Sequence, residues 1–193
     1  MSTIVVVQKR GQACIAADSL TSFGDLKLAS QYDRFHDKIQ SFGDSHIGIV
    51  GSAAHVLVIE HLLQRDDFEA NFTDRETIFH GLLEMHALLK EHYYLSPQGE
   101  EDDPYESSRM DGVIASPQGI FGIYALREVY QYRRFWAVGS GCEFALGAMH
   151  AVYDQLDSAE QIARIGIEAG AEFDIASALP MSSRTLQLET TEE

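Results

Sequence analysis

The chain has 193 residues, a length typical of one domain rather than of several. Hydrophobic residues make up 45% of it and charged residues 23%, which excludes a disordered or collagen-like protein and predicts an ordinary buried core. The 14 basic residues stand against 30 acidic ones, and the formal charge of −16 argues against nucleic acid and anionic membranes as partners.

The sequence has no segment typical of a membrane-spanning or an exported protein. The apolar stretch 47–63 is interrupted by a glutamate and two histidines, and the start of the chain lacks a charged region followed by an apolar one. Two isolated cysteines, Cys14 and Cys142, form no Cys-x-x-Cys pair and suit a reducing compartment. We therefore expect a cytoplasmic protein.

The first part of the chain is predicted to consist of strands. Residues 3–7 and 13–17 are apolar runs, the first of them rich in β-branched residues, and a short turn between them predicts a hairpin. Residues 38–42 and 46–50 flank a Gly-Asp-Ser turn and predict a second hairpin. Four strands are expected before any helix.

After residue 52 the apolar residues recur at the spacing of helices with one buried face. Buried positions are expected at Val56, Ile59 and Leu63 in one helix and at Phe79, Leu82, Leu83 and Leu89 in the next. A capping-box pattern at Thr73–Glu76 marks the start of the second helix. The polar and acidic stretch 96–108 predicts an exposed connecting loop.

The second half repeats this order. Strands are predicted at 112–115, 120–125 and 129–138, and a last short strand at 185–188. Between them lie two helices: one has apolar positions at Phe144, Leu146, Met149 and Val152, and the other begins at Ser158–Gln161 and runs towards Ser177.

This order of elements predicts an α+β protein. The arrangement that buries every apolar face is a four-layer αββα sandwich, in which two antiparallel sheets pack face to face and a helix pair covers each outer side. We expect a single domain over residues 1–193, with a core that reaches residue 188 and an acidic tail at 189–193.

The usual motifs of metal and nucleophile sites are incomplete in this sequence. None of the eight histidines forms a His-x-x-x-His pair, so neither a metal site nor a cofactor is expected. Ser140 lies in a Gly-Ser-Gly turn, but Val138 stands where a nucleophile elbow requires glycine. Considered alone, Ser140 is a turn residue.

The start of the chain is more informative, because Ser2 directly precedes the first strand. The initiator methionine is generally removed when the next residue is as small as serine. Ser2 would then carry both a hydroxyl and an α-amine, and such an amine has a pKa of about 7.7 to 8.0, close to neutral. This pairing is the basis of N-terminal nucleophile catalysis.

Several short motifs, in order, resemble those of the proteasome β-subunit and HslV peptidase family of Ntn hydrolases, and most of all its small betaproteobacterial homologues. Ser2-Thr3-Ile4-Val5 is similar to the Thr-Thr-Ile-Val start of the family, and the resemblance extends to about residue 186. The other matching segments are Ala16-Ala17-Asp18-Ser19, Asp37-Lys38-Ile39, Val50-Gly51-Ser52-Ala53, Gly139-Ser140-Gly141 and Asp174-Ile175-Ala176-Ser177.

The resemblance implies a role for each matched residue. Ser2 would be the nucleophile, Asp18 and Lys38 a buried ion pair that favours its deprotonation, and the Gly51 N–H the oxyanion donor. Ser140, Asp174 and Ser177 would hold the terminal amine. Substrate would bind as an added strand against Ser22 and Ala53, with its side chain in a pocket floored by Ile49, for which an apolar residue is the expected occupant.

Three features depart from the family pattern. Serine replaces threonine as the nucleophile, so the methyl group that restricts χ1 is missing. The spacing from Asp18 to Lys38 is longer than usual, in the region 26–36, which leaves Arg34 as an alternative basic residue. If Met1 were retained, Ser2 would carry an amide where the amine base is needed.

The resemblance further implies stacked homo-oligomeric rings, peptide or unfolded protein as substrate, and an AAA+ unfoldase as a plausible partner. The number of subunits in a ring is not encoded in such patterns. Three functions are carried forward: a self-compartmentalised N-terminal serine peptidase, a small-molecule amide hydrolase of the Ntn class, and a catalytically silent assembly protein with the same fold.

Overall fold

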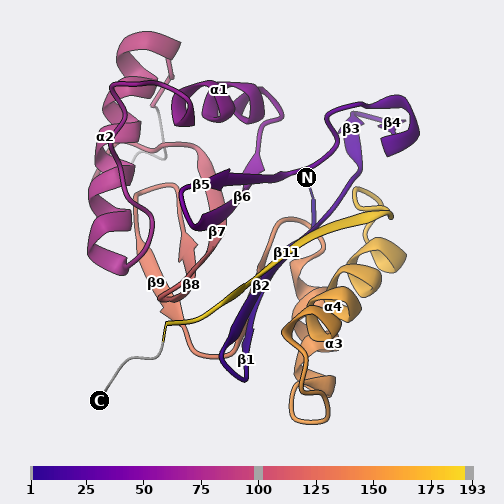
Figure 1. Cartoon of the computed structure of the whole chain (residues 1–193). Helices are drawn as coiled ribbons and strands as arrows, with labels where there is room; N and C mark the ends of the chain where they lie inside the picture. The colour runs from indigo at the N-terminus through magenta and orange to yellow at the C-terminus, as the bar shows by residue number, and fades with distance from the viewer. Residues whose placement is uncertain (1, 98–101, 190–193) are drawn as a thin grey trace.

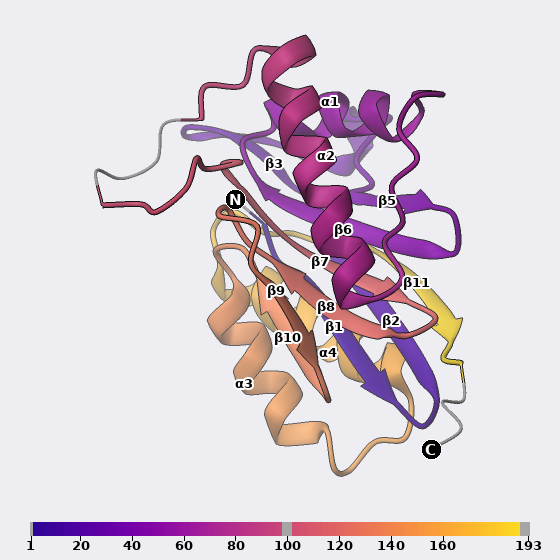
Figure 2. The same cartoon turned by 90° about the vertical axis from the view of Figure 1, so that its left-hand side faces the viewer.

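A computed structural model describes residues 2–97 and 102–189 as two antiparallel sheets packed face to face, with a pair of helices outside each sheet (Figures 1 and 2). The four-stranded sheet has the order β10 (Phe135–Val138), β1 (Ile4–Lys9), β2 (Gln12–Asp18), β11 (Met181–Gln187). The five-stranded sheet has the order β5 (Ile39–Phe42), β6 (Ser45–Gly51), β7 (Met110–Ser116), β8 (Gly119–Ile123), β9 (Val129–Tyr132). This is the predicted αββα sandwich.

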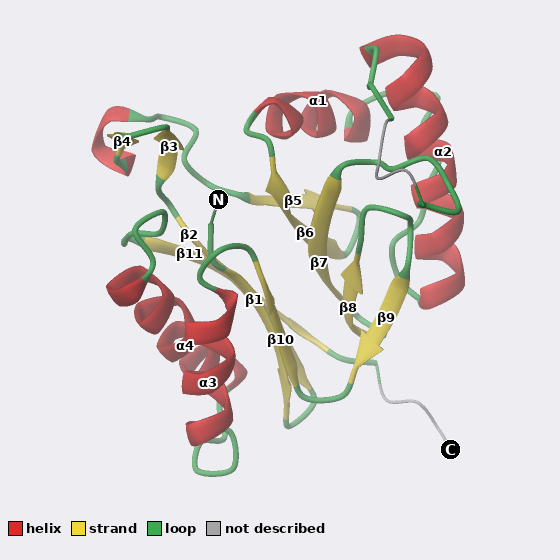
Figure 3. Ribbon diagram, turned by 180° about the vertical axis from the view of Figure 1, so that it is seen from behind, coloured by secondary structure: helices red, strands yellow, loops and turns green. Residues whose placement is uncertain are grey.

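The helices occupy the two outer layers. On the five-stranded sheet lie α1 (Ala54–Leu63) and α2 (Arg75–Tyr93), and on the four-stranded sheet lie α3 (Cys142–Val152) and α4 (Ala159–Phe173) (Figure 3). Within residues 2–97 and 102–189, none of the helices combines the length and the apolar character needed to cross a bilayer.

Strand β1 shows why the sequence specifies four layers. Ile4 and Val6 pack between the two sheets, whereas Val5 and Val7 pack against α3 and α4. A strand with both faces covered contains no polar alternation, so it appears in the sequence as an uninterrupted Ile-Val-Val-Val run. Such a run also marks β1 as an inner strand rather than an edge, and it pairs with β2 and β10 on its two sides.

Two predictions about strands were wrong. A small hairpin of β3 (Thr21–Phe23) and β4 (Leu26–Leu28) and a 3₁₀ turn, η1 (Ser30–Tyr32), also precede α1. Their apolar side chains are largely exposed, so no burial pattern signals them in the sequence. The expected strand 129–138 is two strands in different sheets, since β9 pairs with β8 and β10 pairs with β1. The run of strand-forming residues is continuous, so the sequence does not indicate where the chain passes from one sheet to the other.

Some helix ends and some buried positions differ from those predicted from the sequence. Asp74, not Thr73, is the N-cap of α2, and the capping box joins Asp74 to Thr77. Helix α4 ends at Phe173, and β11 begins at Met181 rather than at residue 185. Of the positions expected to be buried, Ile59, Leu63, Leu82, Leu89 and Met149 are buried, Leu146 and Val152 are partly buried, and Val56, Phe79, Leu83 and Phe144 are exposed.

The expected loop 96–108 is described only in part, because residues 98–101 lie outside the described residues. Its described residues are largely exposed up to Glu106, but Ser107 and Ser108 are buried. The tail 190–193 also lies outside the described residues.

Candidate active site around Ser2

The register of the four-stranded sheet brings the candidate residues together at one end of the sandwich. Ile4 pairs with Ala17 on one side and with Val138 on the other. Ser2 therefore lies between the end of β2, which leads to Asp18, and the end of β10, which leads into the Gly-Ser-Gly turn. Met181, at the start of β11, pairs with Asp18 and brings the segment after α4 to the same place.

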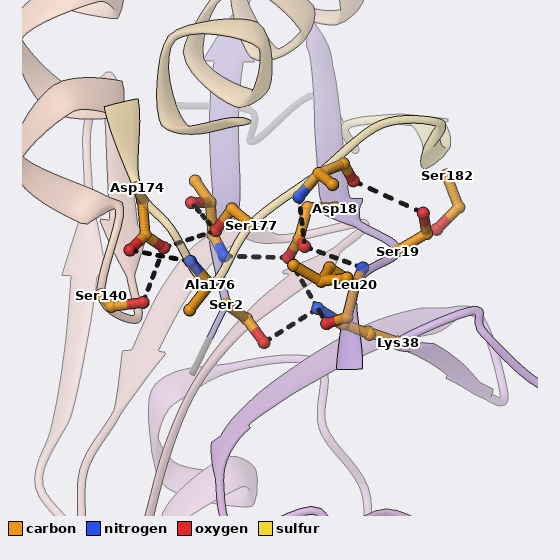
Figure 4. Close-up of polar contacts among 12 residues, drawn as sticks. Ser2, Asp18, Ser19, Leu20, Lys38, Ser140, Asp174, Ala176, Ser177 and Ser182 are labelled. Atoms are coloured by element: carbon orange, nitrogen blue, oxygen red, sulfur yellow. Dashed lines mark hydrogen bonds and ion pairs between the residues drawn. The ribbon is translucent and has the colours of Figure 1, made fainter. Parts of the chain in front are cut away.

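Asp18 is a fully buried carboxylate in which both oxygens accept hydrogen bonds (Figure 4). Oδ1 accepts from the Thr3 N–H at 3.0 Å and from Lys38 Nζ at 2.7 Å. Oδ2 accepts from the backbone N–H groups of Leu20 at 3.0 Å and Ala178 at 3.1 Å. A buried charge is tolerated only when it is paired and hydrogen-bonded in this way.

Lys38, just before β5, points its ammonium group at Ser2. Nζ donates to Ser2 Oγ at 2.9 Å, to Asp18 Oδ1 at 2.7 Å and to the carbonyl of Leu20 at 2.7 Å. A charged lysine has three N–H donors, so this geometry uses all of them. Burial lowers the pKa of Lys38 from its ordinary 10.5, although the negative charge of Asp18 opposes that shift.

Arg34, the alternative basic residue, does not occupy this position. It is exposed, and its guanidinium carbon lies 5.9 Å from the centre of the Phe35 ring. The structure thus brings Lys38, and not Arg34, to the hydroxyl of Ser2.

A second cluster lies on the opposite side of Ser2, centred on Asp174. Both Ser140 Oγ and Ser177 Oγ donate to Asp174 Oδ2 at 2.7 Å. Because Ser177 gives its single proton to Asp174, the hydroxyl of Thr3, 2.7 Å away, donates to Ser177. Burial alone would raise the pKa of Asp174, but these hydroxyl donors and the N–H of Ala176 outweigh it and hold the pKa below its ordinary 3.8.

The turn after β10 requires its glycines because the N-terminal strand lies so close. A Cβ atom on Gly139, which has φ +95°, would lie 2.0 Å from the carbonyl oxygen of Ser2. A Cβ atom on Gly141 would lie 2.0 Å from Thr3 Oγ1, and the Gly141 N–H donates to the carbonyl of Ser2 at 3.4 Å. This turn therefore helps to fix the position of Ser2.

Gly51, the candidate oxyanion donor, ends β6. Its φ of +137° lies in a region that side chains other than glycine rarely adopt. A Cβ atom there would also lie 3.2 Å from the carbonyl oxygen of Arg109. Glycine is thus required by the backbone at this position.

A cavity of about 580 Å³ is lined in part by Ser2. The predicted substrate-binding residues Ser22, Ile49 and Ala53 line it, together with Gly51. Sequence reasoning missed other lining residues, which come from the segment before β5 and from α1: Asp33, Phe35, His36, Val56, Leu57 and Glu60. The hydrogen bond between the hydroxyls of Thr3 and Ser177 was also not predicted. The only indication in the sequence is that a small polar residue follows Ser2.

Comparison with solved structures shows to which family the chain belongs. The structure of Thiobacillus denitrificans BPH in complex with epoxomicin is 40% identical to the chain, with a TM-score of 0.89. The match covers 97% of this chain and 100% of that one. The chain belongs to the bacterial proteasome homologue (BPH) family. The expected resemblance is thereby confirmed, and the family makes the chain a proteasome-fold peptidase in general terms.

Two further matches agree with this membership. Another structure of Thiobacillus denitrificans BPH is 42% identical to this chain and has a TM-score of 0.88. That match covers 97% of this chain and 98% of the other. HslV from Trypanosoma brucei is 19% identical to this chain, with a TM-score of 0.68, and shares its fold. The match covers 96% of this chain and 99% of the HslV chain. No family model and no curated protein gives a significant match.

The region that the structure describes, residues 2–97 and 102–189, contains no group of three or more His, Cys, Asp or Glu side chains arranged to hold a metal ion. The polar groups assembled around Ser2 are instead an ammonium, two carboxylates and several hydroxyls. Such a set suits proton transfer and nucleophilic attack by a hydroxyl.

The hydrogen bonds of Asp18 give a testable prediction about stability. Asp18→Asn would turn an amide N–H₂ group towards N–H donors and leave the Lys38 ammonium buried without its counter-ion. We expect the free energy of unfolding to fall by about 3 to 5 kcal/mol, measured by urea denaturation at neutral pH.

The matched control is Asp25→Asn, at an exposed position between β3 and β4, which should change stability by less than about 0.5 kcal/mol. Equal losses in the two variants would contradict this account of Asp18.

Proposed function

We propose that the chain is an N-terminal serine peptidase that cleaves peptide bonds through an acyl-enzyme on Ser2 after Met1 is removed. The contact that carries the proposal is the hydrogen bond of 2.9 Å from Lys38 Nζ to Ser2 Oγ, with Asp18 on the same ammonium group. An ammonium beside a hydroxyl stabilises the alkoxide form and so makes the oxygen more nucleophilic. Membership of a proteasome-type family supports the same assignment.

In the proposed reaction, the α-amine of Ser2 accepts the hydroxyl proton while Oγ attacks the substrate carbonyl. The N–H of Gly51 donates to the oxyanion that forms, and the α-ammonium returns the proton to the departing amine. Water then adds to the ester on Ser2 and releases the carboxylic acid, which regenerates the hydroxyl. Lys38 keeps its proton throughout and acts through charge.

Asp174, Ser140 and Ser177 are proposed to orient the N-terminus rather than to react. The hydroxyl of Thr3, one residue after the nucleophile, connects to this cluster through Ser177. An anionic Asp174 beside the terminus also favours the protonated form of the amine, which the second half of the proton transfer requires.

Ser2→Ala is predicted to reduce peptide hydrolysis by at least about 10³-fold, because it removes the attacking oxygen. Ser2→Thr should retain or raise activity, since the added methyl group restricts χ1 and fixes the direction of the hydroxyl. The measurement is kcat/KM on fluorogenic peptides, with the intact mass of each protein determined first to establish whether Met1 is absent.

The two other functions give different results in the same assay. A small-molecule amide hydrolase would ignore the peptides and yet lose its amidase activity in Ser2→Ala. A silent assembly protein would retain Met1 or show no difference between wild type and Ser2→Ala. Either result would contradict the peptidase proposal.

The pKa shift of Lys38 predicts the shape of the pH profile. Activity should rise as pH increases through the pKa of the α-amine, which must be unprotonated to act as a base. It should then fall as Lys38 loses its proton, and because burial lowers the pKa of Lys38, this alkaline limb should lie below pH 10.5. The test is kcat/KM against pH, and a profile still rising at pH 10.5 would contradict the role of Lys38.

We further propose that the chain assembles with itself into stacked rings in the cytoplasm and receives unfolded substrate from an AAA+ unfoldase. Family membership supports the rings, and exposed apolar residues that do not line the cavity, such as Leu26 and Tyr32, supply contact surface. Two free cysteines fit a reducing compartment.

The assembly prediction is tested by sedimentation velocity at micromolar concentration. The sedimenting species should have a mass that is an even multiple of the 21.5 kDa chain, as two stacked rings require. A purely monomeric protein would contradict the assembly proposal without affecting the assignment of Ser2.

A further inference from the structure

The cavity beside Ser2 has one wall formed by a single face of α1. Val56, Leu57 and Glu60 line it together with Ala53, the N-cap of the helix, at the spacing of one helical face. The wall thus passes from apolar residues to a carboxylate along the helix axis. Ile49, two residues before the end of β6, adds another apolar contact.

The charges that line this cavity do not cancel. Lys38 is paired with Asp18 at 2.7 Å, and Asp37 is paired with Arg184 at 2.6 Å. The two remaining acidic side chains, Asp33 and Glu60, form no ion pair with any cationic side chain of residues 2–97 and 102–189.

The surroundings of these two carboxylates leave acceptor capacity open to a ligand. Glu60 accepts one hydrogen bond, from Gln40 Nε2 at 3.0 Å, and Asp33 accepts one from the N–H of Phe35 at 2.9 Å. Each carboxylate has room for several donors. The remaining titratable group of the lining is His36, whose Nδ1 lies 3.0 Å from the carbonyl oxygen of Asp33.

We infer that this cavity selects substrates with a basic side chain, lysine or arginine, on the residue whose carbonyl is attacked by Ser2, and that Glu60 is the main specificity-determining residue. The inference rests on the proposed peptidase function and names its substrate class. Lysine and arginine combine an apolar stem with a cationic end, which matches the order of Val56, Leu57 and Glu60 along α1. An apolar preference, as expected from Ile49 alone, leaves Asp33 and Glu60 without a role.

The inference is tested with capped fluorogenic peptides that differ only at the residue before the cleaved bond: Leu, Phe, Gln, Glu, Lys or Arg. The assay is run at about pH 8, where imidazoles in general carry little charge. The wild type should cleave the Lys and Arg peptides with kcat/KM at least about fivefold above the Leu and Gln peptides, and the Glu peptide should be the poorest.

Substitution of Glu60 isolates its contribution. Glu60→Gln keeps the size and the acceptor for Gln40 but removes the charge, and should lower the ratio of kcat/KM for Lys over Leu by about fivefold. The change should come from the Lys peptide, whose kcat/KM should fall because its cationic end loses the opposite charge. Glu60→Lys should reverse the preference in favour of the Glu peptide, and Asp33→Asn should have a smaller effect in the same direction as Glu60→Gln.

The matched control is Glu168→Gln on α4, an exposed glutamate in the opposite outer layer of the sandwich. It removes the same charge from the whole protein and should leave the Lys-to-Leu ratio unchanged. An equal fall in this ratio in Glu60→Gln and Glu168→Gln would assign the effect to net charge and overturn the role of Glu60.

Two failures are distinguishable. Cleavage after Leu or Phe in preference to Lys and Arg, lost in Ser2→Ala and unchanged in Glu60→Gln, would overturn the inference and leave the peptidase function intact. No cleavage of any peptide by folded protein with Met1 removed would overturn the peptidase function and the inference together.

Discussion

The buried carboxylate of Asp18 is the interaction on which the arrangement around Ser2 depends. A buried carboxylate needs hydrogen-bond donors on both oxygens. For Asp18 these donors are the backbone N–H groups of Thr3, Leu20 and Ala178 and the ammonium of Lys38. One side chain thus holds together parts of the chain that are 160 residues apart in sequence. The hydrogen bonds that the buried Asp18 carboxylate needs therefore also fix the position of Ser2.

The layers of the fold could be predicted because they depend on patterns that survive in the sequence. The uninterrupted apolar run of β1 indicates a strand covered on both faces, and the alternation of strand pairs with helix pairs leaves few ways to bury every apolar face. The β3–β4 hairpin could not be found in the same way, because exposed strands carry no burial pattern. The crossing between β9 and β10 is decided by which sheet each segment pairs with, a long-range choice that local composition does not record.

The site was predictable in a different sense. Ser2, Lys38 and Asp18 came from short motifs that resemble a family, and the contacts among them follow from register and burial, which no single motif contains. Glu60 escaped prediction because a glutamate on an amphipathic helix is ordinarily assigned to solvent. Only the packing of α1 beside the end of β6 shows that this glutamate lines the cavity.

The close approach of Gly139 and Gly141 to residues 2 and 3 has a consequence for how relatives of this chain should be compared. Any side chain at these positions would overlap the N-terminal strand, whether or not the protein catalyses a reaction. Selection for the fold alone would therefore preserve both glycines in a lineage that had lost its activity. The hydroxyl of Ser2 is different, since the glycine turn lies against the backbone carbonyl of that residue and not against its side chain. Across diverging sequences, loss of the hydroxyl at residue 2 beside an intact glycine turn would mark the members that have lost the chemistry and kept the architecture.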